Sequence, residues 1–101
     1  MKPLLSIVIP TKNRQVYAIE AIASVLRADD GQGKMEAVVQ DCSDTSLLAS
    51  MIAIKFPNAS LINYQYDNKT LTMEDNWDKA FTRASGIYVC GIGDDDMVLT
   101  N

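Results

Sequence analysis

Three consecutive carboxylates, Asp94, Asp95 and Asp96, are the residues of this chain best suited to chemistry. They follow an apolar, strand-like segment at residues 87–92, with Gly93 between. Adjacent carboxylates repel one another, by on the order of a few kcal/mol at the effective dielectric of a protein surface. A divalent cation removes that repulsion, because Mg²⁺ and Mn²⁺ prefer hard oxygen ligands and commonly hold substrate phosphates too. We therefore interpret the triplet as metal ligands, with a solvated acidic turn as the alternative.

A second polar group follows the strand predicted at residues 36–40. Here Asp41 can accept a hydrogen bond from a base N–H group or from a ribose hydroxyl. Ser43 and Asp44 are good helix-capping residues, so we assign capping of the next helix to one of these two and ligand contact to Asp41. Capping alone is the competing interpretation of this group.

The segment from Pro10 to Arg14 is a third candidate, because it joins the first predicted strand to the first helix. Free backbone N–H groups at a helix start favour anions, and Lys12 or Arg14 can reach a phosphate. The sequence has no glycine-rich phosphate loop of the GxGxxG or Walker type. For Lys12 and Arg14 an ordinary polar turn is an equal alternative.

The hydrophobic pattern predicts the elements that position these residues. Apolar or alternating runs indicate strands at residues 4–9, 36–40, 60–66 and 87–92. Amphipathic spacing indicates helices at residues 15–27, 47–56 and 72–86. Alternating strands and helices predict a parallel sheet with right-handed crossovers. The carboxyl ends of the strands, and with them the three polar segments, would then meet along one edge.

Several single residues have structural interpretations. The face of the first helix is expected to contain Ile19, Ile22, Ala23 and Leu26, and the polar alternation at residues 60–66 indicates a strand near the sheet edge. Thr72 is expected to cap the third helix and Gly86 to end it. Trp77 is expected in the core, and Asn76 to bind backbone.

Composition narrows the function classes. The chain has 101 residues, a net charge of −4 and no basic run, which argues against binding to nucleic acid through its phosphates. It has no histidine, which excludes Ser-His-Asp and Cys-His catalysis and His-ligated zinc within these residues. No apolar stretch approaches the roughly 20 residues of a membrane span. Cys42 and Cys90 are interpreted as small buried apolar residues in a reducing compartment.

Four stretches occur together in a specific order and spacing. They are Ser6–Arg14, Val38–Thr45, the pattern Asp75-Asn76-Trp77 with Ala80, Ala84, Gly86 and Tyr88, and Gly93–Asp96. With them, the chain resembles the nucleotide-binding half of family 2 glycosyltransferases of the GT-A fold, from Leu5 to Leu99. The resemblance implies a three-layer, Rossmann-like α/β half-domain. Its four-stranded parallel sheet would have the order 3-2-1-4, with helices on both faces. That order separates Cys42 from Cys90 and argues against a disulfide.

The resemblance also implies an activity and a site. Such enzymes transfer a sugar from a nucleoside diphosphate donor, with Mn²⁺ or Mg²⁺ bridging the diphosphate and with inversion. By similarity, Asp41 would bind the base, and Asp94–Asp96 would match the DXD element that holds the metal and donor ribose. Because Gly93 stands where relatives have their first Asp, the ligands are Asp94 with Asp96 or Asp95 with Asp96. The nucleotide-sugar site would comprise Pro10, Thr11, Arg14, Asp41, Ser43 and Asp94.

The family domain is about twice this length, a usual domain size. We therefore interpret residues 1–101 as a truncated donor-binding half, without a catalytic base, that binds but does not catalyse on its own. Its expected partners are a UDP-sugar and a glycan or lipid acceptor, not nucleic acid. The unpaired edge of the fourth strand predicts self-association. We expect a cytoplasmic location, or the inner face of the membrane for a full-length protein.

Two other classes remain as alternatives. One is a different Mg²⁺-dependent phosphate-binding module, such as a receiver or Toprim-like domain. A receiver needs paired acids after its first strand, where this chain has Thr11 and Lys12. The other is a non-catalytic interaction domain with a solvated acidic edge.

Overall fold

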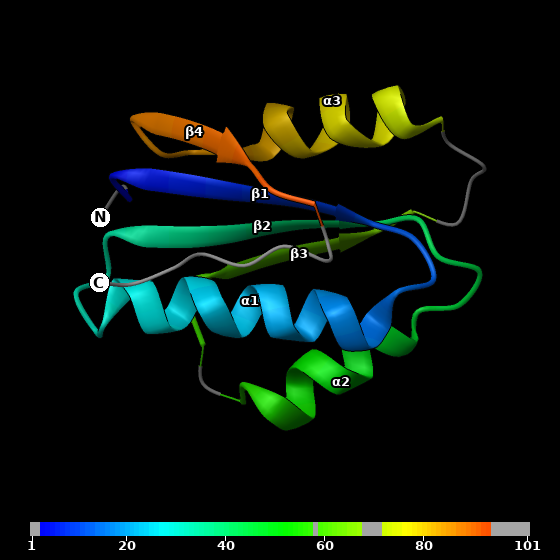
Figure 1. The fold of residues 1–101 in the computed structure, drawn as a ribbon, viewed down its shortest axis with the longest axis horizontal. Helices are drawn as coiled ribbons and strands as arrows, with labels where there is room; N and C mark the ends of the chain where they lie inside the picture. Colours follow the sequence, from blue (N-terminus) through cyan, green and yellow to red (C-terminus); the bar gives the residue numbers. More distant parts are fainter. Residues whose placement is uncertain (1–2, 58, 68–71, 94–101) are drawn as a thin grey trace.

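The computed structural model describes residues 3–57, 59–67 and 72–93 of the chain. Its elements alternate between strand and helix in the order β1 (Leu5–Thr11), α1 (Gln15–Asp29), β2 (Met35–Asp41), α2 (Leu47–Lys55), β3 (Ile62–Tyr66), α3 (Met73–Arg83) and β4 (Tyr88–Gly91). The strands form one sheet in the order β3-β2-β1-β4, and every pairing is parallel (Figure 1). This confirms the predicted fold class and strand order.

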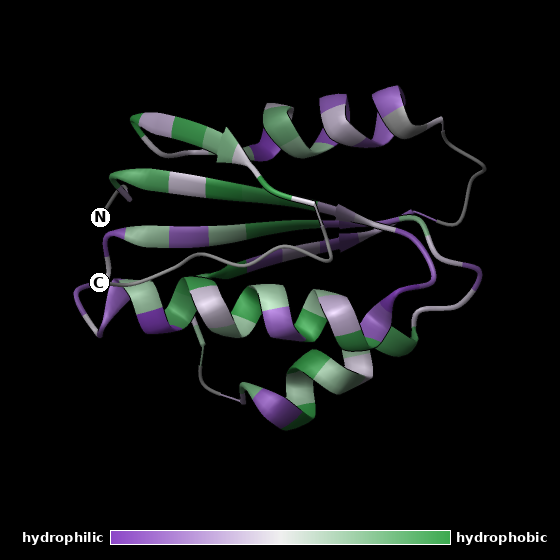
Figure 2. Cartoon of the chain, in the orientation of Figure 1, coloured by the Kyte–Doolittle hydropathy of each residue, from purple (hydrophilic) through white to green (hydrophobic). Residues whose placement is uncertain are grey.

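One face of the sheet is covered by α1 and α2, and it carries the larger hydrophobic core. Side chains of a strand alternate between faces, so Ile7 and Ile9 of β1 lie beside Ala37 and Val39 of β2. The buried members that α1 and α2 add to this cluster are Ala18, Ala21, Ile22, Val25 and Leu48. The apolar residues of α1 and α2 are visible along the helices in Figure 2. Burial of this apolar surface is what holds the two helices on the sheet.

In the part of the chain that the structure describes, the opposite face is covered by α3, and its core is small. Val8, Val38 and Ala80 form the buried apolar cluster of this face, with Trp77 and Ala84 packed against it. The Trp77 ring stacks on Phe81 with the ring centroids 5.7 Å apart. Trp77 packs against the core as predicted, but its side chain is only partly buried. The rest of this interface is polar.

Two helix boundaries depend on carboxylate or hydroxyl contacts. Thr72 caps α3 as predicted, because its Oγ1 accepts a hydrogen bond from the Asp75 N–H at 3.1 Å. At the end of α1 the buried carboxylate of Asp29 accepts hydrogen bonds from three backbone N–H groups, those of Gly33, Lys34 and Met35. These bonds hold the turn into β2, in which Asp30, Gly31 and Gly33 have positive φ.

The predicted apolar face of α1 was only partly right. Ile22 is buried, but Ile19, Ala23 and Leu26 are only partly buried. The buried positions that the pattern did not predict include Ala18, Ala21, Ser24 and Val25, because the helix lies close against β1 and β2.

The predicted cap of α2 was wrong. The helix begins at Leu47 after Ser46, whose side chain makes no capping bond. Ser43 and Asp44 lie before this point and are bound to the loop that follows β1 instead. A good capping residue is therefore no evidence for a cap when another loop competes for the same side chain.

The predicted role of Gly86 was also wrong, because α3 already ends at Arg83. A Cβ atom at Gly86 would lie 2.8 Å from the backbone nitrogen of Ser6, and the Gly86 N–H donates to Ser6 Oγ at 2.8 Å. Gly86 thus serves close packing of two chain segments rather than a helix stop.

The edge strand β4 pairs only with β1 among the described residues, and all four of its residues are exposed. Ile87 and Tyr88 are 67% and 66% exposed. This position corrects the prediction for the cysteines: Cys42 is buried, but Cys90 is exposed because it lies on β4. Both thiols are free, as the strand order implied. No helix in the part of the chain described here is long and apolar enough to span a membrane.

Candidate functional site

The ends of the parallel strands meet along one edge of the sheet, as predicted. Thr11, the last residue of β1, is in register with Asp41, the last residue of β2, and Asp41 is in register with Tyr66 of β3. The Ile92 N–H donates to the carbonyl oxygen of Val8, so Ile92 continues the pairing with β1 in the direction of the same edge. The predicted ligands Asp94, Asp95 and Asp96 lie outside the described residues. Their roles stay predictions.

Asp41 is fully buried, and its carboxylate is bound by three donors. Oδ1 accepts hydrogen bonds from the Ser43 backbone N–H at 3.0 Å and from Ser43 Oγ at 2.5 Å. Oδ2 accepts one from the Tyr64 hydroxyl at 2.7 Å. The hydrogen bond from the Ser43 N–H to the side chain of Asp41, two residues earlier, forms an Asx-turn that shapes the loop after β2. A carboxylate offers about four lone-pair sites. One site on Oδ2 is left for a ligand donor.

The loops after β1 and β2 are joined by a clasp, which we define as Asn13, Ser43 and Asp44. The Asn13 N–H donates to Ser43 Oγ at 2.7 Å. The Asn13 side chain accepts from the Asp44 N–H at 2.9 Å and donates to the Asp44 carboxylate at 3.2 Å. Asn13 has a φ of 56°, a left-handed conformation that Asn tolerates better than most residues. The clasp holds together the two loops in which the nucleotide site was predicted.

Tyr64 and Asn13 are the site residues that sequence reasoning missed. Tyr64 lies on the α1 and α2 side of the sheet, and its hydroxyl reaches Asp41 because β2 and β3 are in parallel register. Burial raises the pKa of Tyr64, and its hydrogen bond to Asp41 raises it further. The hydroxyl therefore stays protonated and remains a donor to Asp41. The one available signal was the placement of two tyrosines near the end of a strand that otherwise resembles an edge strand.

The remaining predicted binding residues lie around the same corner. Pro10, Thr11 and Ser43 are buried. Arg14 and Lys12 are exposed, and Arg14 directly precedes the first turn of α1 without a side-chain capping bond. This leaves a helix N-terminus with two nearby cations, an arrangement that favours an anion such as phosphate.

The acidic triplet Asp94–Asp96 stays the predicted metal site. In residues 3–57, 59–67 and 72–93, no group of three or more acidic or cysteine side chains could hold a metal ion. Carboxylates are the oxygen donors that Mg²⁺ and Mn²⁺ prefer, so the donor set of Asp94–Asp96 fits such an ion chemically.

Comparison with known proteins decides the family. The family model described as "Glycosyl transferase family 2" matches residues 6–101. The chain belongs to glycosyl transferase family 2. It is also similar to the protein named "Putative colanic acid biosynthesis glycosyl transferase WcaA" of Escherichia coli (strain K12), with 38% identity over 96 residues. That alignment covers 93% of this chain and 33% of the relative, so the chain spans about a third of the relative's length.

Membership of family 2 confirms the resemblance seen in the sequence and favours a transferase over the receiver, Toprim-like and interaction-domain alternatives. The structure brings Thr11, Asp41 and Ser43 together at one corner of the family 2 fold, with Pro10 on the same strand. In that corner the carboxylate of Asp41 is already engaged by the protein itself.

Proposed function

We propose that this chain is the donor-binding region of a metal-dependent glycosyltransferase. The complete enzyme would transfer a sugar from a nucleoside diphosphate sugar, most simply a UDP-sugar, to an acceptor hydroxyl with inversion. The observation that carries this proposal is the family 2 match over residues 6–101. The meeting of Thr11, Asp41 and Ser43 at the carboxyl ends of β1 and β2 supports it, because ligands of open parallel sheets bind at that edge.

In the proposed site Asp41 recognises the nucleobase. Ser43 occupies Oδ1 twice, so a ring N–H of the base would bind at Oδ2 beside the Tyr64 hydroxyl. Because Asp41 is fully buried, the side chains around it have to move slightly before a base can reach that oxygen. The diphosphate would lie toward the start of α1, where Lys12 and Arg14 are exposed.

In this proposal Asp94, Asp95 and Asp96 hold Mn²⁺ or Mg²⁺ beside the diphosphate. The ion would stabilise the negative charge of the leaving diphosphate. The name of the E. coli relative refers to colanic acid biosynthesis, so we take a glycan rather than a lipid as the acceptor class. The catalytic base is assigned to no residue of this chain.

The test is a titration of the ¹⁵N-labelled chain with UDP, with and without Mg²⁺, followed by NMR. We expect backbone shifts at Thr11, Asp41 and Ser43 with UDP, and stronger binding when Mg²⁺ is present. Asp41→Asn should weaken UDP binding about tenfold, the loss of one hydrogen bond to a charged group. Asp30→Asn, an exposed acid at the other end of the sheet, is the control.

Mn²⁺ tests the metal ligands separately. Its paramagnetism should broaden the signals of residues 94–96 in the presence of UDP, and Asp96→Ala should reduce that broadening. Broadening confined to other acidic residues would contradict the metal-dependent part of the proposal. A UDP affinity that is the same with and without the metal would contradict it too.

We further propose that β4 associates with β4 of a second copy. Tyr88 and Val89 expose large apolar side chains on β4, whose only partner among the described residues is β1, and Ile87 exposes another directly before the strand. Sedimentation equilibrium should therefore show a dimer whose population rises with concentration. Val89→Lys should shift the population toward monomer, whereas Val16→Lys on α1 should not. A wild-type chain that stays monomeric at high concentration contradicts this interface.

A further inference from the structure

A pocket of about 290 Å³ lies between α3 and the ends of β2 and β3. It is lined by Gln40, Gln65, Asp78, Lys79, Thr82 and Arg83. Gln40 immediately precedes Asp41 in β2, and neighbouring side chains of a strand point to opposite faces, so this pocket is separate from the nucleotide corner. Its volume is near the lower end of the range for ligand pockets, about 300–1,000 Å³, which suits one small ring.

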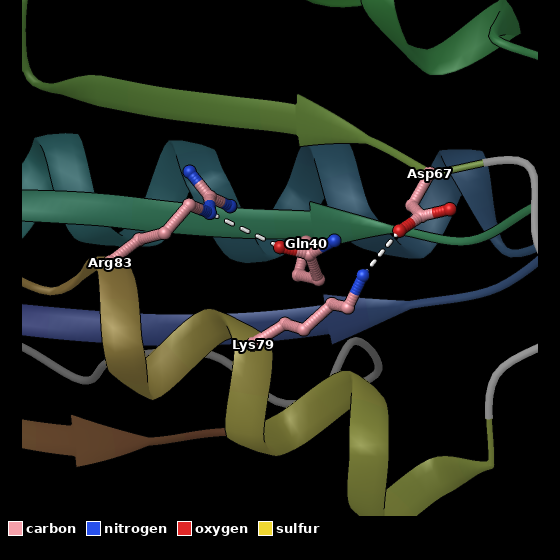
Figure 3. A network of polar contacts seen from close by, with 4 residues as sticks. All are labelled: Gln40, Asp67, Lys79 and Arg83. Carbon is pink, nitrogen blue, oxygen red and sulfur yellow. Dashed lines mark hydrogen bonds and ion pairs between the residues drawn. The ribbon is translucent and has the colours of Figure 1, made fainter.

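The pocket contains a buried polar group without a partner. Gln40 is fully buried, and its Oε1 accepts a hydrogen bond from Arg83 Nε at 3.1 Å (Figure 3). Its Nε2 is buried too and has no hydrogen-bond partner among the described residues. Nearly all buried side-chain polar atoms in folded proteins have a partner. The base of this pocket therefore provides two N–H groups that an acceptor on a ligand could satisfy.

The walls of the pocket supply further donors and acceptors. Arg83 makes four hydrogen bonds, to Gln40, to two oxygens of Asn63 and to the carbonyl of Val39, which leaves one of its five N–H groups. Lys79 donates to Asp67 at 2.6 Å and has two more N–H groups. The carboxylate of Asp78 adds acceptors at the exposed side of the pocket.

The charges around the pocket are balanced, which decides the class of ligand. Lys79 is paired with Asp67. Burial lowers the pKa of Arg83, and the nearby negative charge of Glu36 opposes that effect. With Asp78 at the pocket as well, the site has no excess of positive charge that would favour a phosphate or a carboxylate. A neutral ligand with hydroxyl groups fits better, because each hydroxyl both donates and accepts.

We propose that this pocket binds one neutral sugar residue through its hydroxyl groups, at a site distinct from the nucleotide corner. One hydroxyl would accept from Gln40 Nε2 and another would donate to Asp78. The amide nitrogen of Gln40 lies on the side of the Lys79–Asp67 ion pair in Figure 3, and the Lys79 side chain is 46% exposed. That ion pair has to shift for a hydroxyl to reach the amide.

The experiment is a titration of the ¹⁵N-labelled chain with glucose and galactose, and in parallel with inorganic phosphate. We expect both hexoses to shift the side-chain amide signals of Gln40 and Gln65, and phosphate to leave them unchanged. Shifts with phosphate alone would replace this proposal with an anion site, and no shift with either hexose at saturating concentration would overturn it. UDP binding is read at Thr11 and Asp41, so it succeeds or fails independently.

Two variants sharpen the result. Asp78 is exposed, and Asp78→Asn should raise the hexose Kd about three- to tenfold because a carboxylate acceptor is lost. Gln40→Glu keeps the acceptor for Arg83 but removes the N–H donors, so it should weaken hexose binding about tenfold or more. Glu20→Gln, an exposed change of the same kind on α1, is the control. Hexose affinity that Asp78→Asn leaves unchanged would contradict the proposed contact even if Gln40→Glu failed to fold.

Discussion

The two faces of the sheet are stabilised in different ways, although β1 and β2 contribute to both. On the face under α1 and α2, Ile9, Val39 and Leu48 are buried among other apolar side chains. On the face under α3, the same strands present Ser6, Glu36 and Gln40, which are buried among polar partners. One strand can therefore serve a hydrophobic layer and a hydrogen-bonded layer at once, because its side chains alternate.

The polar face depends on a few multiply bonded groups. The carboxylate of Glu36 accepts hydrogen bonds from Ser6 Oγ at 2.6 Å and from the N–H and Oγ of Ser85 at 2.9 and 3.0 Å. Arg83 links α3 to β2 and β3. Loss of one such group leaves several buried partners unsatisfied, whereas loss of an apolar side chain leaves a cavity. The faces should therefore respond differently to substitution.

The largest effect is expected on the apolar face. Ile22→Ala removes a fully buried side chain from the larger core and should lower the free energy of unfolding by about 3 kcal/mol. Urea denaturation measures this change. Ile54→Ala, at a position that is 83% exposed, should change it by less than about 0.5 kcal/mol. Equal effects of the two variants would mean that α1 is not held by burial.

A charge-preserving change tests the polar face. Arg83→Lys keeps the positive charge but cannot reproduce the guanidinium contacts with Gln40, Asn63 and Val39. We expect a loss of about 2 kcal/mol in the free energy of unfolding. Arg27→Lys, at an exposed position on α1, should leave it unchanged. If Arg83→Lys also left the free energy of unfolding unchanged, the charge of Arg83 rather than the geometry of its hydrogen bonds would stabilise this face.

Asp29 is a buried acid at the end of α1, and it predicts a pH dependence. Burial alone would raise the pKa of Asp29, but hydrogen bonds from the backbone N–H groups of Gly33, Met35 and Lys34 lower it below its usual value of 3.8. A lowered pKa means that the carboxylate stabilises the fold above pH 4 and that this contribution is lost as the pH falls through the folded value.

Asp29→Asn should accordingly lower the free energy of unfolding by about 1–2 kcal/mol at pH 7 and by much less at acidic pH. Urea denaturation of both proteins across the range from neutral pH to pH 3 measures the difference. Asp30→Asn, at the exposed neighbouring position, serves as the control. A constant difference at every pH would show that the lost stability does not come from ionisation.

The smallest effect concerns the start of α3. Thr72→Ala removes the acceptor for the Asp75 N–H and should lower the free energy of unfolding by about 1 kcal/mol. Thr72→Ser keeps a hydroxyl acceptor and should retain most of that stability. Hydrogen exchange should be faster in the first turn of α3 and unchanged in α1. Faster exchange throughout the molecule would indicate that the two layers unfold together.

The helices and strands, and their succession along the chain, could be predicted from the sequence. The period of the hydrophobic residues and the turn-forming residues between the elements are local properties. The corner at Thr11 and Asp41 could be predicted too, since parallel strands place their ends together. The partners of Asp41 could not. Tyr64 reaches Asp41 through the register of β2 and β3. Ser43 binds Asp41 and Asn13 instead of capping α2, which depends on how the two loops meet.

The polar layer under α3 did leave a signal in the sequence. Glu36 and Gln40 lie on the same face of the strand predicted at residues 36–40, with Val38 between them, and Ser6 of β1 is in register with Glu36. Polar residues that repeat with the strand period indicate a face that needs partners. In the structure Arg83 of α3 supplies a partner for Gln40. Predicting that residue would require the packing angle of α3, which is not a local property of the sequence.

The difference between the two thiols has a practical consequence. Burial raises the pKa of the Cys42 thiol and keeps it from reacting, whereas Cys90 is exposed on the outer strand. A maleimide fluorophore added to the unmodified protein should therefore attach at Cys90 alone. Its emission would then report whatever comes to rest against that strand, without an engineered cysteine and without a label in the nucleotide corner.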